Sequence, residues 1–187
     1  MDILVSTDWL AENMGASDLR IVDASYFLPE MGRDASAEYE AQHIPGAVFL
    51  NLAELADATS PLANTVPQPE KFASRMQALG LGDGSRIVLY DNSPLKSAAR
   101  AWWLFELFGA PNNAVLDGGL GKWIAEKREV ESGKQQLRHR HFTVWRDDKA
   151  IASKHQVLEN IGTKAAQVVD ARTMSRFTAE EPEVRPG

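Results

Sequence analysis

The sequence contains no cysteine among its 187 residues. These residues can therefore form no disulfide, no thiolate metal site and no thiol nucleophile. Any sulfur chemistry that the chain takes part in has to be completed by polypeptide outside the printed sequence.

Positive charge is also scarce. Lys and Arg number 20 against 26 Asp and Glu, which gives a formal net charge of −6 and an isoelectric point near 5.3. We expect no nucleic-acid partner, because phosphate affinity depends on clustered cations. No segment is long and apolar enough to span a bilayer, and residues 1–4 lack the features of a signal peptide. We therefore expect a cytoplasmic protein without a membrane partner.

Apolar residues make up 44% of the chain and charged residues 25%, as in ordinary globular proteins. Residues 6–128 alternate short apolar strands with helical stretches, which predicts an α/β domain. The run 87–90 is apolar without alternation and predicts a central parallel strand covered on both faces. The other predicted elements are helices at 6–13, 37–42, from 69 to about 79, 97–108 and around 123, and strands at 19–24 and 114–116.

The segment that follows is polar and shows no apolar period. We predict an inter-domain linker over residues 129–150. His139 and His141 alternate with arginines there, but two histidines without further ligands make a poor metal site. We expect neither a metal nor a cofactor.

The chain after this segment repeats its own beginning at a constant offset of about 147 residues. Ser6 corresponds to Ser153, and the tripeptide Val-Asp-Ala at 22–24 recurs at 169–171. A constant offset over two elements indicates duplication. Residues 151–187 are thus predicted to be the incomplete start of a second domain, by truncation, by cleavage or because a partner chain is missing.

One long motif carries a family resemblance. The run Tyr-Glu-Ala-Gln-His-Ile-Pro-Gly-Ala-Val-Phe-Leu at 39–50 resembles a signature of the tandem-domain rhodanese family, the thiosulfate and 3-mercaptopyruvate sulfurtransferases. Supporting matches lie at 22–25, 32–34, 100–103, 116–120, 170–172, 176–177 and 185–187. The resemblance implies a rhodanese-like fold, a central parallel sheet with helices on both faces, in which residues 1–128 are the non-catalytic copy.

The resemblance also implies the chemistry. A cysteine of the second domain takes sulfane sulfur from 3-mercaptopyruvate or thiosulfate and passes it, as a persulfide, to a thiol or cyanide acceptor. In this chain the position that resembles the cysteine is Asp91, in the loop 91–96. A carboxylate cannot carry sulfane sulfur, so we assign no catalytic residue within the chain. Asp91 is expected to cap its loop; an aspartyl-phosphate role is the less favoured alternative.

The resemblance assigns substrate binding to Arg176 and Arg185. A guanidinium group matches a planar carboxylate in bidentate fashion and stays charged at any working pH. The alternative is a pair of surface arginines that neutralise the acidic residues at 180–183. Ala53 and Asn64 stand where mercaptopyruvate enzymes often carry an aspartate and a histidine for proton transfer. This either weakens mercaptopyruvate against thiosulfate as donor or indicates a proton path through other groups.

Several residues admit a structural role. We expect His43, Asp23, Asp170 and Arg172 to hold backbone or pair charges rather than react. By resemblance, Tyr26, Leu95 and Lys96 shield the persulfide of the other domain, but they are equally interpretable as ordinary loop residues. The alternative for the whole protein is a non-catalytic rhodanese-like module that binds a partner through its surface.

Overall fold

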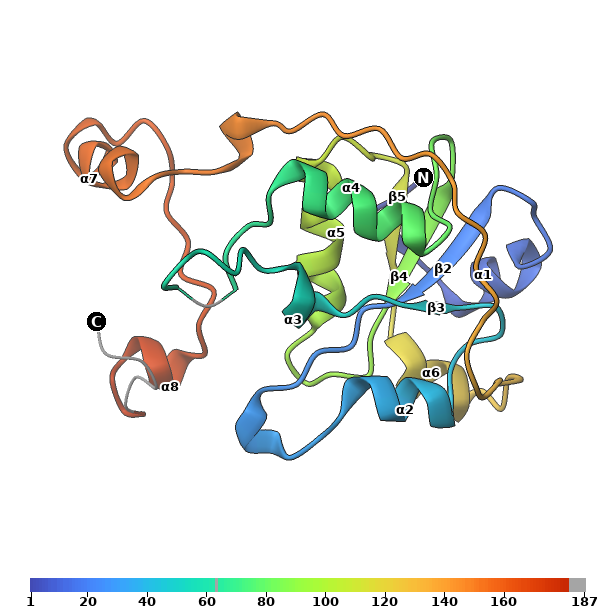
Figure 1. Ribbon diagram of the computed structural model, residues 1–187. Helices are drawn as coiled ribbons and strands as arrows, with labels where there is room; N and C mark the ends of the chain where they lie inside the picture. Colours follow the sequence, from blue (N-terminus) through green and yellow to red (C-terminus); the bar gives the residue numbers. More distant parts are fainter. Residues whose placement is uncertain (63, 182–187) are drawn as a thin grey trace. The chain divides into compact units, whose positions relative to one another are not determined.

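The computed structural model describes residues 1–62 and 64–181. The chain divides into two compact units, Met1–Asp148 and Lys149–Gly187, of which the first carries a five-stranded parallel sheet in the order β1-β5-β4-β2-β3 (Figure 1). The strands are β1 (Leu4–Val5), β2 (Leu19–Asp23), β3 (Val48–Phe49), β4 (Arg86–Tyr90) and β5 (Asn113–Leu116). The predicted strand at 87–90 is indeed the middle strand of the sheet.

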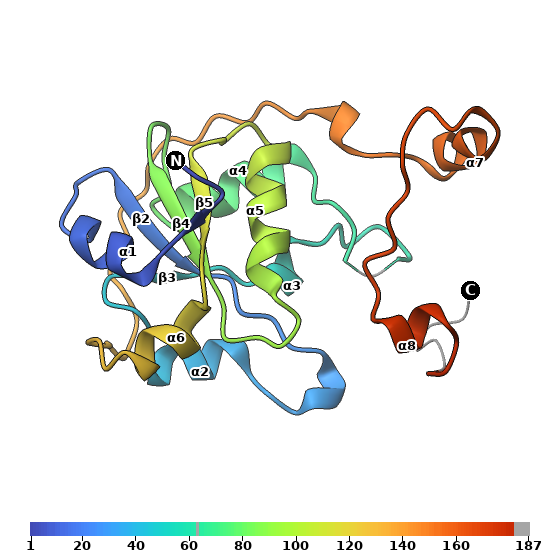
Figure 2. The same cartoon turned by 180° about the vertical axis from the view of Figure 1, so that it is seen from behind.

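Helices cover both faces of this sheet. Figures 1 and 2 show α1, α2 and α6 on one side and α3, α4 and α5 on the other. Their bounds are α1 Thr7–Asn13, α2 Ala35–Ala41, α3 Leu52–Leu55, α4 Pro69–Ala78, α5 Ser97–Leu107 and α6 Gly119–Ala125, with a 3₁₀ turn η1 at Pro29–Met31. Ser6 caps α1 by accepting a hydrogen bond from the Trp9 N–H at 3.1 Å. The predicted α/β fold is confirmed.

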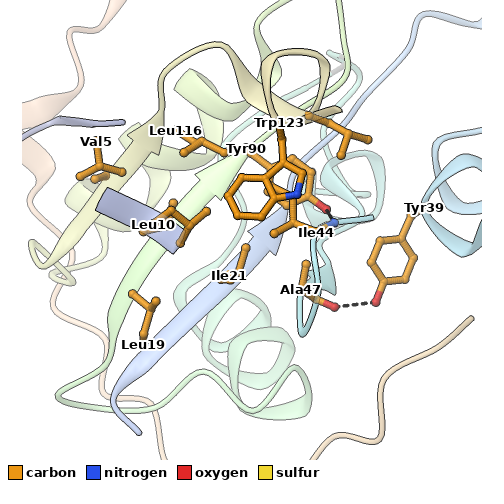
Figure 3. Packing of buried hydrophobic residues seen from close by; sticks show 13 residues of the cluster. Val5, Leu10, Leu19, Ile21, Tyr39, Ile44, Ala47, Tyr90, Leu116 and Trp123 are labelled. Atoms are coloured by element: carbon orange, nitrogen blue, oxygen red, sulfur yellow. Dashed lines mark hydrogen bonds between the residues drawn. The ribbon is translucent and has the colours of Figure 1, made fainter. Parts of the chain in front are cut away.

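The alternation of side chains along the strands sorts the core into two layers. Val88 and Tyr90 on β4 share a buried cluster with Leu19 and Ile21 on β2 (Figure 3). Ile87 and Leu89 point to the opposite face, since successive strand residues do so, and both are buried as well. A strand buried on both faces requires an uninterrupted apolar run, which is why this segment shows no alternation of polarity.

The predicted linker packs against the first unit. Residues 129–147, which we call the strap, are extended and begin with an antiparallel bridge between His43 and Glu131. Further along, Asp83 accepts hydrogen bonds from the Thr143 N–H and Oγ1–H, each at 2.7 Å. The Trp145 N–H then donates to the Phe108 carbonyl at 3.1 Å. That the strap also joins two domains stays a prediction.

One strap residue enters the hydrophobic core. Phe142 is 4% exposed, and its ring meets those of Phe72 and Phe105 edge to face, at centroid distances of 5.8 and 6.3 Å. Phe108 stacks on Phe72 at 4.4 Å and completes an aromatic cluster on the α4 and α5 side of the sheet. The strap therefore supplies part of the core of the first unit.

The 3₁₀ turn η2 (Asp148–Ala150) spans the boundary between the units, and the second unit contains α7 (Lys154–Thr163) and α8 (Met174–Phe177). Ser153 caps α7 as Ser6 caps α1, through the N–H three residues on. Asp170 accepts a hydrogen bond from the Arg172 N–H at 2.9 Å, as Asp23 does from the Ser25 N–H at 2.8 Å. These paired local structures support the duplication.

The repeat implies that the second unit contains a strand corresponding to β2. No such strand forms in the described residues. Residues 167–171 have no regular secondary structure, and Val168 and Val169 are 70% and 79% exposed. The corresponding Ile21 and Val22 are buried between neighbouring strands. A strand is stable only where its N–H and C=O groups meet those of a neighbour, and no such neighbour is present for residues 167–171 within the described part of the chain.

Candidate functional site

The carboxyl ends of the parallel strands meet at one edge of the sheet, where α/β proteins place their reactive loops. The loop 91–96 leaves β4 and leads into α5 there. On either side lie the segment after β2, which begins at Ala24, and the turn 117–118 after β5. These three connections form the candidate site.

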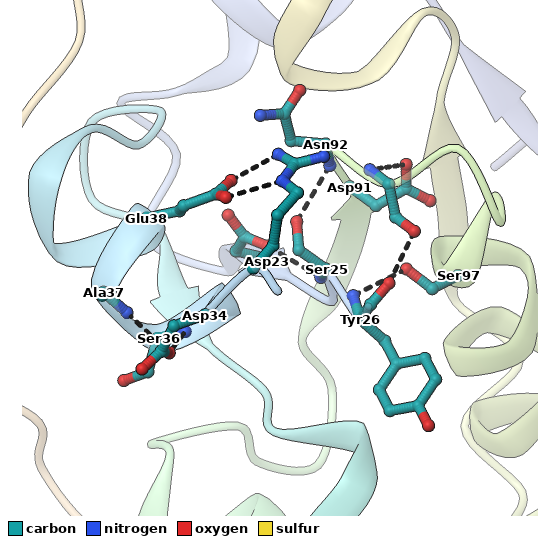
Figure 4. A network of polar contacts seen from close by, with 12 residues as sticks. Asp23, Ser25, Tyr26, Asp34, Ser36, Ala37, Glu38, Asp91, Asn92 and Ser97 are labelled. Carbon is teal, nitrogen blue, oxygen red and sulfur yellow. Dashed lines mark hydrogen bonds and ion pairs between the residues drawn. The ribbon is translucent and has the colours of Figure 1, made fainter. Parts of the chain in front are cut away.

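Asp91 uses its carboxylate inside its own loop. Oδ1 accepts a hydrogen bond from the Ser93 N–H at 3.1 Å (Figure 4). Oδ2 accepts one from the Ala98 N–H, in the first turn of α5, at 2.7 Å. Its backbone carbonyl accepts the Leu120 N–H at 3.1 Å. The carboxylate thus caps the loop and the helix, as predicted, which leaves it badly placed for nucleophilic attack.

The side chains of three serines form hydrogen bonds between this loop and the segment after β2. The Asn92 N–H donates to Ser25 Oγ at 2.9 Å, and the Ser93 hydroxyl donates to the Tyr26 carbonyl at 2.6 Å. Ser97 Oγ accepts the Tyr26 N–H at 3.1 Å and donates to the Ala24 carbonyl at 2.8 Å. Sequence reasoning missed these serines, although short hydroxyl side chains next to strand ends are a recognised signal for backbone bonding.

A cavity of about 420 Å³ opens beside the loop, between it and the turn at Gly118. Its charged lining residues are Asp91, Lys96 and Asp117, and no histidine lines it. Lys96 adopts a left-handed backbone conformation with φ of 53° just before α5. The described residues contain no group of three histidines or carboxylates arranged to hold a metal ion. The cavity therefore carries charged side chains but no group able to bear sulfane sulfur.

Asp23 is buried at the end of β2, behind this loop. Burial raises the pKa of its carboxyl group above the ordinary 3.8, opposed by hydrogen bonds from Ser25 and Tyr90, while the charge of Asp91 raises it further. Burial likewise raises the pKa of Tyr90 well above 10. Asp23 is thus a structural residue, which fixes the start of the segment after β2 by accepting the Ser25 N–H.

The raised pKa of Asp23 predicts a pH-dependent stability. Between pH 3.8 and the raised folded pKa, the folded state holds a proton that the unfolded state has lost, so the stabilisation by protonated Asp23 is lost as pH rises. Asn at this position does not titrate. In urea unfolding at several pH values, the free energy of unfolding of Asp23→Asn should increase relative to that of the wild type as pH rises above 3.8. A constant difference would contradict the shift.

His43 is a scaffold residue, as predicted. Its ring is fully buried, lies 2.7 Å from the Tyr39 carbonyl through Nδ1, and stacks on the Tyr39 ring at 4.2 Å. Tyr39 in turn donates to the Ala47 carbonyl at 2.7 Å. The motif at 39–50 thus folds as a rigid turn that fixes β3 beside β2.

The two predicted substrate-binding arginines belong to the part of the sequence after the unit that carries this edge. Arg176 lies half-buried on α8 in the second unit, and Arg185 lies outside the described residues. Arg172 pairs with Asp170 at 2.8 Å, in line with its predicted structural role. The backbone carbonyl of Asn64 accepts a hydrogen bond from the Arg100 side chain at 2.5 Å. The binding roles of Arg176 and Arg185 stay predictions.

The fold and the loop at its carboxyl edge define a rhodanese-like domain, and comparison with known proteins agrees. Residues 6–126 match the family described as rhodanese-like domain. The chain therefore belongs to the rhodanese-like family. Among the helices of the described residues, none combines the length and apolar character needed to cross a bilayer.

Particular relatives are sulfurtransferases. The 3-mercaptopyruvate sulfurtransferase of Homo sapiens is 40% identical over 190 residues, which cover 98% of this chain and 64% of the relative. The thiosulfate sulfurtransferase of Cricetulus griseus is 37% identical, over 96% of this chain and 62% of the relative. The crystal structure of SseA from Escherichia coli superimposes with a TM-score of 0.90 at 36% identity, covering 99% of this chain and 71% of SseA. The chain thus spans just under two thirds of these two curated relatives.

Proposed function

We propose that this chain is the non-catalytic domain and the beginning of the catalytic domain of a sulfurtransferase. The observation that carries the proposal is the loop 91–96, which stands where the family holds its persulfide but presents Asp91 with both carboxylate oxygens bonded to backbone N–H groups. The domain that contains this loop has no sulfur carrier, so the reactive cysteine belongs to polypeptide outside these 187 residues.

The proposed reaction is a double displacement. The cysteine thiolate attacks the outer sulfur of the donor, an S–S bond forms, and the bond between that sulfur and the rest of the donor breaks. The leaving group is sulfite from thiosulfate, or the enolate of pyruvate from 3-mercaptopyruvate, which then takes up a proton. A thiol or cyanide acceptor next removes the outer sulfur and restores the thiolate. The chain's own contribution is a rigid domain and donor binding.

We assign donor binding to Arg176 and Arg185. Both donors are anions at neutral pH, and an arginine fork binds oxygen anions through paired hydrogen bonds. Glu180 and Glu181 follow Arg176 in the sequence, so the positive charge of Arg176 also balances part of their negative charge. We likewise propose a cytoplasmic location and a thiol or cyanide as the sulfur acceptor.

Turnover of the full-length protein tests the proposal. Residues 1–187 alone should neither form a persulfide nor turn over thiosulfate or 3-mercaptopyruvate, whereas the full-length protein should do both. Steady turnover by residues 1–187, or a full-length protein without a cysteine at a strand-to-helix loop of its second domain, would overturn it. A full-length protein that lacks this cysteine and binds a partner protein would favour the alternative, a non-catalytic rhodanese-like interaction module.

Donor binding has its own variant. In the full-length protein, Arg176→Gln should raise KM for the donor roughly tenfold or more with a smaller effect on kcat, because a charge-assisted hydrogen bond is lost. Lys154→Gln, which removes an exposed cation from the first turn of α7, is the matched control and should leave KM unchanged. Equal effects of the two variants would show that only the net charge of the unit matters.

A further inference from the structure

A second cavity, of about 370 Å³, lies where strands β4 and β5 begin, at the edge of the sheet opposite the loop 91–96. Its walls come from three segments: the loop before β4 at 82–87, the loop before β5 at 109–112, and the strap at 142–145. All three belong to the first unit. Cavities of this size in proteins hold small molecules or single long side chains.

One wall of this cavity is an exposed tryptophan. Trp145 is 75% exposed, whereas the other four tryptophans of the chain are buried or half-buried. Its backbone is held on both sides, because the Trp145 N–H donates to the Phe108 carbonyl at 3.1 Å and the Asp147 N–H donates to the Leu107 carbonyl at 2.9 Å. The indole is thus an aromatic surface fixed at the rim of the cavity, where a ligand can stack on it.

Asp83 is the charged lining residue of the cavity within the described part of the chain. Its two carboxylate oxygens accept the Thr143 N–H and Oγ1–H, each at 2.7 Å, which leaves about two further acceptor positions. The Thr143 N–H, and next its hydroxyl, lower the pKa of Asp83 below the ordinary 3.8, so the group is ionised at neutral pH. The cavity therefore has a negative wall, which disfavours anions.

The strap brings the carboxylate and the indole to one side. Residues two apart in an extended segment project in the same direction, roughly 7 Å from one another. Thr143, which binds the Asp83 carboxylate, and Trp145 are such a pair. Other carboxylates of the chain also lack a cationic partner, but Asp83 lines the same cavity as an exposed indole.

The interior of the cavity adds a neutral acceptor. Ser85 lines the cavity and is 7% exposed. Its Oγ accepts the Gly82 N–H at 3.4 Å, a long hydrogen bond that leaves a lone pair on this oxygen. An added Cβ on the neighbouring Gly84 would meet no atom within 4 Å, so there is open space beside the serine.

We propose that this cavity binds a guanidinium group, carried by a small molecule or by an arginine side chain of a peptide. A guanidinium ion is flat and cationic, so it stacks on an indole, and its edge presents paired N–H donors to a carboxylate. Trp145 supplies the aromatic face, Asp83 the carboxylate and Ser85 a further acceptor. The site lies at the amino end of the strands and does not depend on the proposed function.

Titration of residues 1–187 with methylguanidinium chloride, followed by ¹H–¹⁵N NMR, tests this site. The experiment is run at about pH 8, because His141 adjoins Asp83 and imidazoles are neutral there, and at constant ionic strength set with sodium chloride. The Trp145 indole signal and the amide signals of Gly84 and Gly109 should shift along one saturable curve. The other four indole signals should stay fixed.

A matched ligand and matched variants separate the contributions. Methylurea has the same flat shape and N–H groups without the charge, and should bind roughly tenfold more weakly or less. Asp83→Asn should also weaken methylguanidinium binding roughly tenfold or more, although its amide oxygen can still accept from Thr143. Trp145→Ala, followed through the glycine amides, should weaken binding roughly threefold or more. Glu12→Gln removes an exposed carboxylate of α1 that does not line the cavity, and binding should persist.

The same titration distinguishes the two sources of the guanidinium group. A short peptide with a central arginine that binds more tightly than methylguanidinium would identify a peptide, and weaker or equal binding would identify a small molecule. Equal binding of methylurea, shifts that do not saturate, or binding that survives both Asp83→Asn and Trp145→Ala would overturn the site. The Thr143 amide signal reports whether Asp83→Asn still holds the strap, and if it does not, Trp145→Ala decides.

Discussion

Replacing Phe142 by alanine is expected to lower the free energy of unfolding of the first unit by about 3–5 kcal/mol. The ring is 4% exposed and packs edge to face on Phe72 and Phe105. Alanine would leave a cavity among side chains that are fully buried and cannot collapse freely. Urea unfolding of residues 1–187, followed by tryptophan fluorescence, to which the buried Trp123 contributes, measures the loss.

Trp145→Ala is the matched control. Trp145 is also an aromatic residue of the strap but is 75% exposed, and alanine keeps the Cβ that lies close to Gly109. Its effect should stay within about 0.5 kcal/mol. If Phe142→Ala were equally mild, the strap would be a loosely attached linker, and the core of the first unit would close without it.

Replacing Gly119 by alanine should destabilise the unit by roughly 2–4 kcal/mol and disturb the loop 91–96. Gly119 has a φ of +56°, which a residue with a Cβ rarely adopts, and the added Cβ would lie 2.4 Å from the Asp91 carbonyl oxygen. That oxygen belongs to backbone and has little room to move, since it also accepts the Leu120 N–H. The close approach of these two chain segments therefore requires glycine.

Gly121→Ala separates this contact from a general effect on α6. Gly121 lies two residues further along the same helix, has no atom within 4 Å of its added Cβ, and has no positive φ. Alanine there should be neutral or stabilise the helix by about 0.5–1 kcal/mol. Amide shifts of Ser93 and Ala98, whose N–H groups bind the Asp91 carboxylate, should change in Gly119→Ala and stay fixed in Gly121→Ala. Equal results for both variants would contradict the close approach.

The sequence alone determined the features that depend on local pattern. An apolar run without alternation identified the central strand β4, and a serine before a helical stretch identified the start of α1. The motif at 39–50 identified the family, and the absence of cysteine excluded a persulfide on this chain. Each of these conclusions needs only the order and chemical type of neighbouring residues.

Tertiary structure decided what depends on partners distant in sequence. The two-residue strands β1 and β3 exist only through pairing with β5 and β2, and the valines at 168 and 169 form no strand in the described unit because no neighbour pairs with them. A single phenylalanine in a polar strap gives no periodic signal, yet Phe142 fills the core. Hydrogen bonds to distant backbone and burial against distant side chains set these outcomes, because their free energy arises only once the chain has closed on itself.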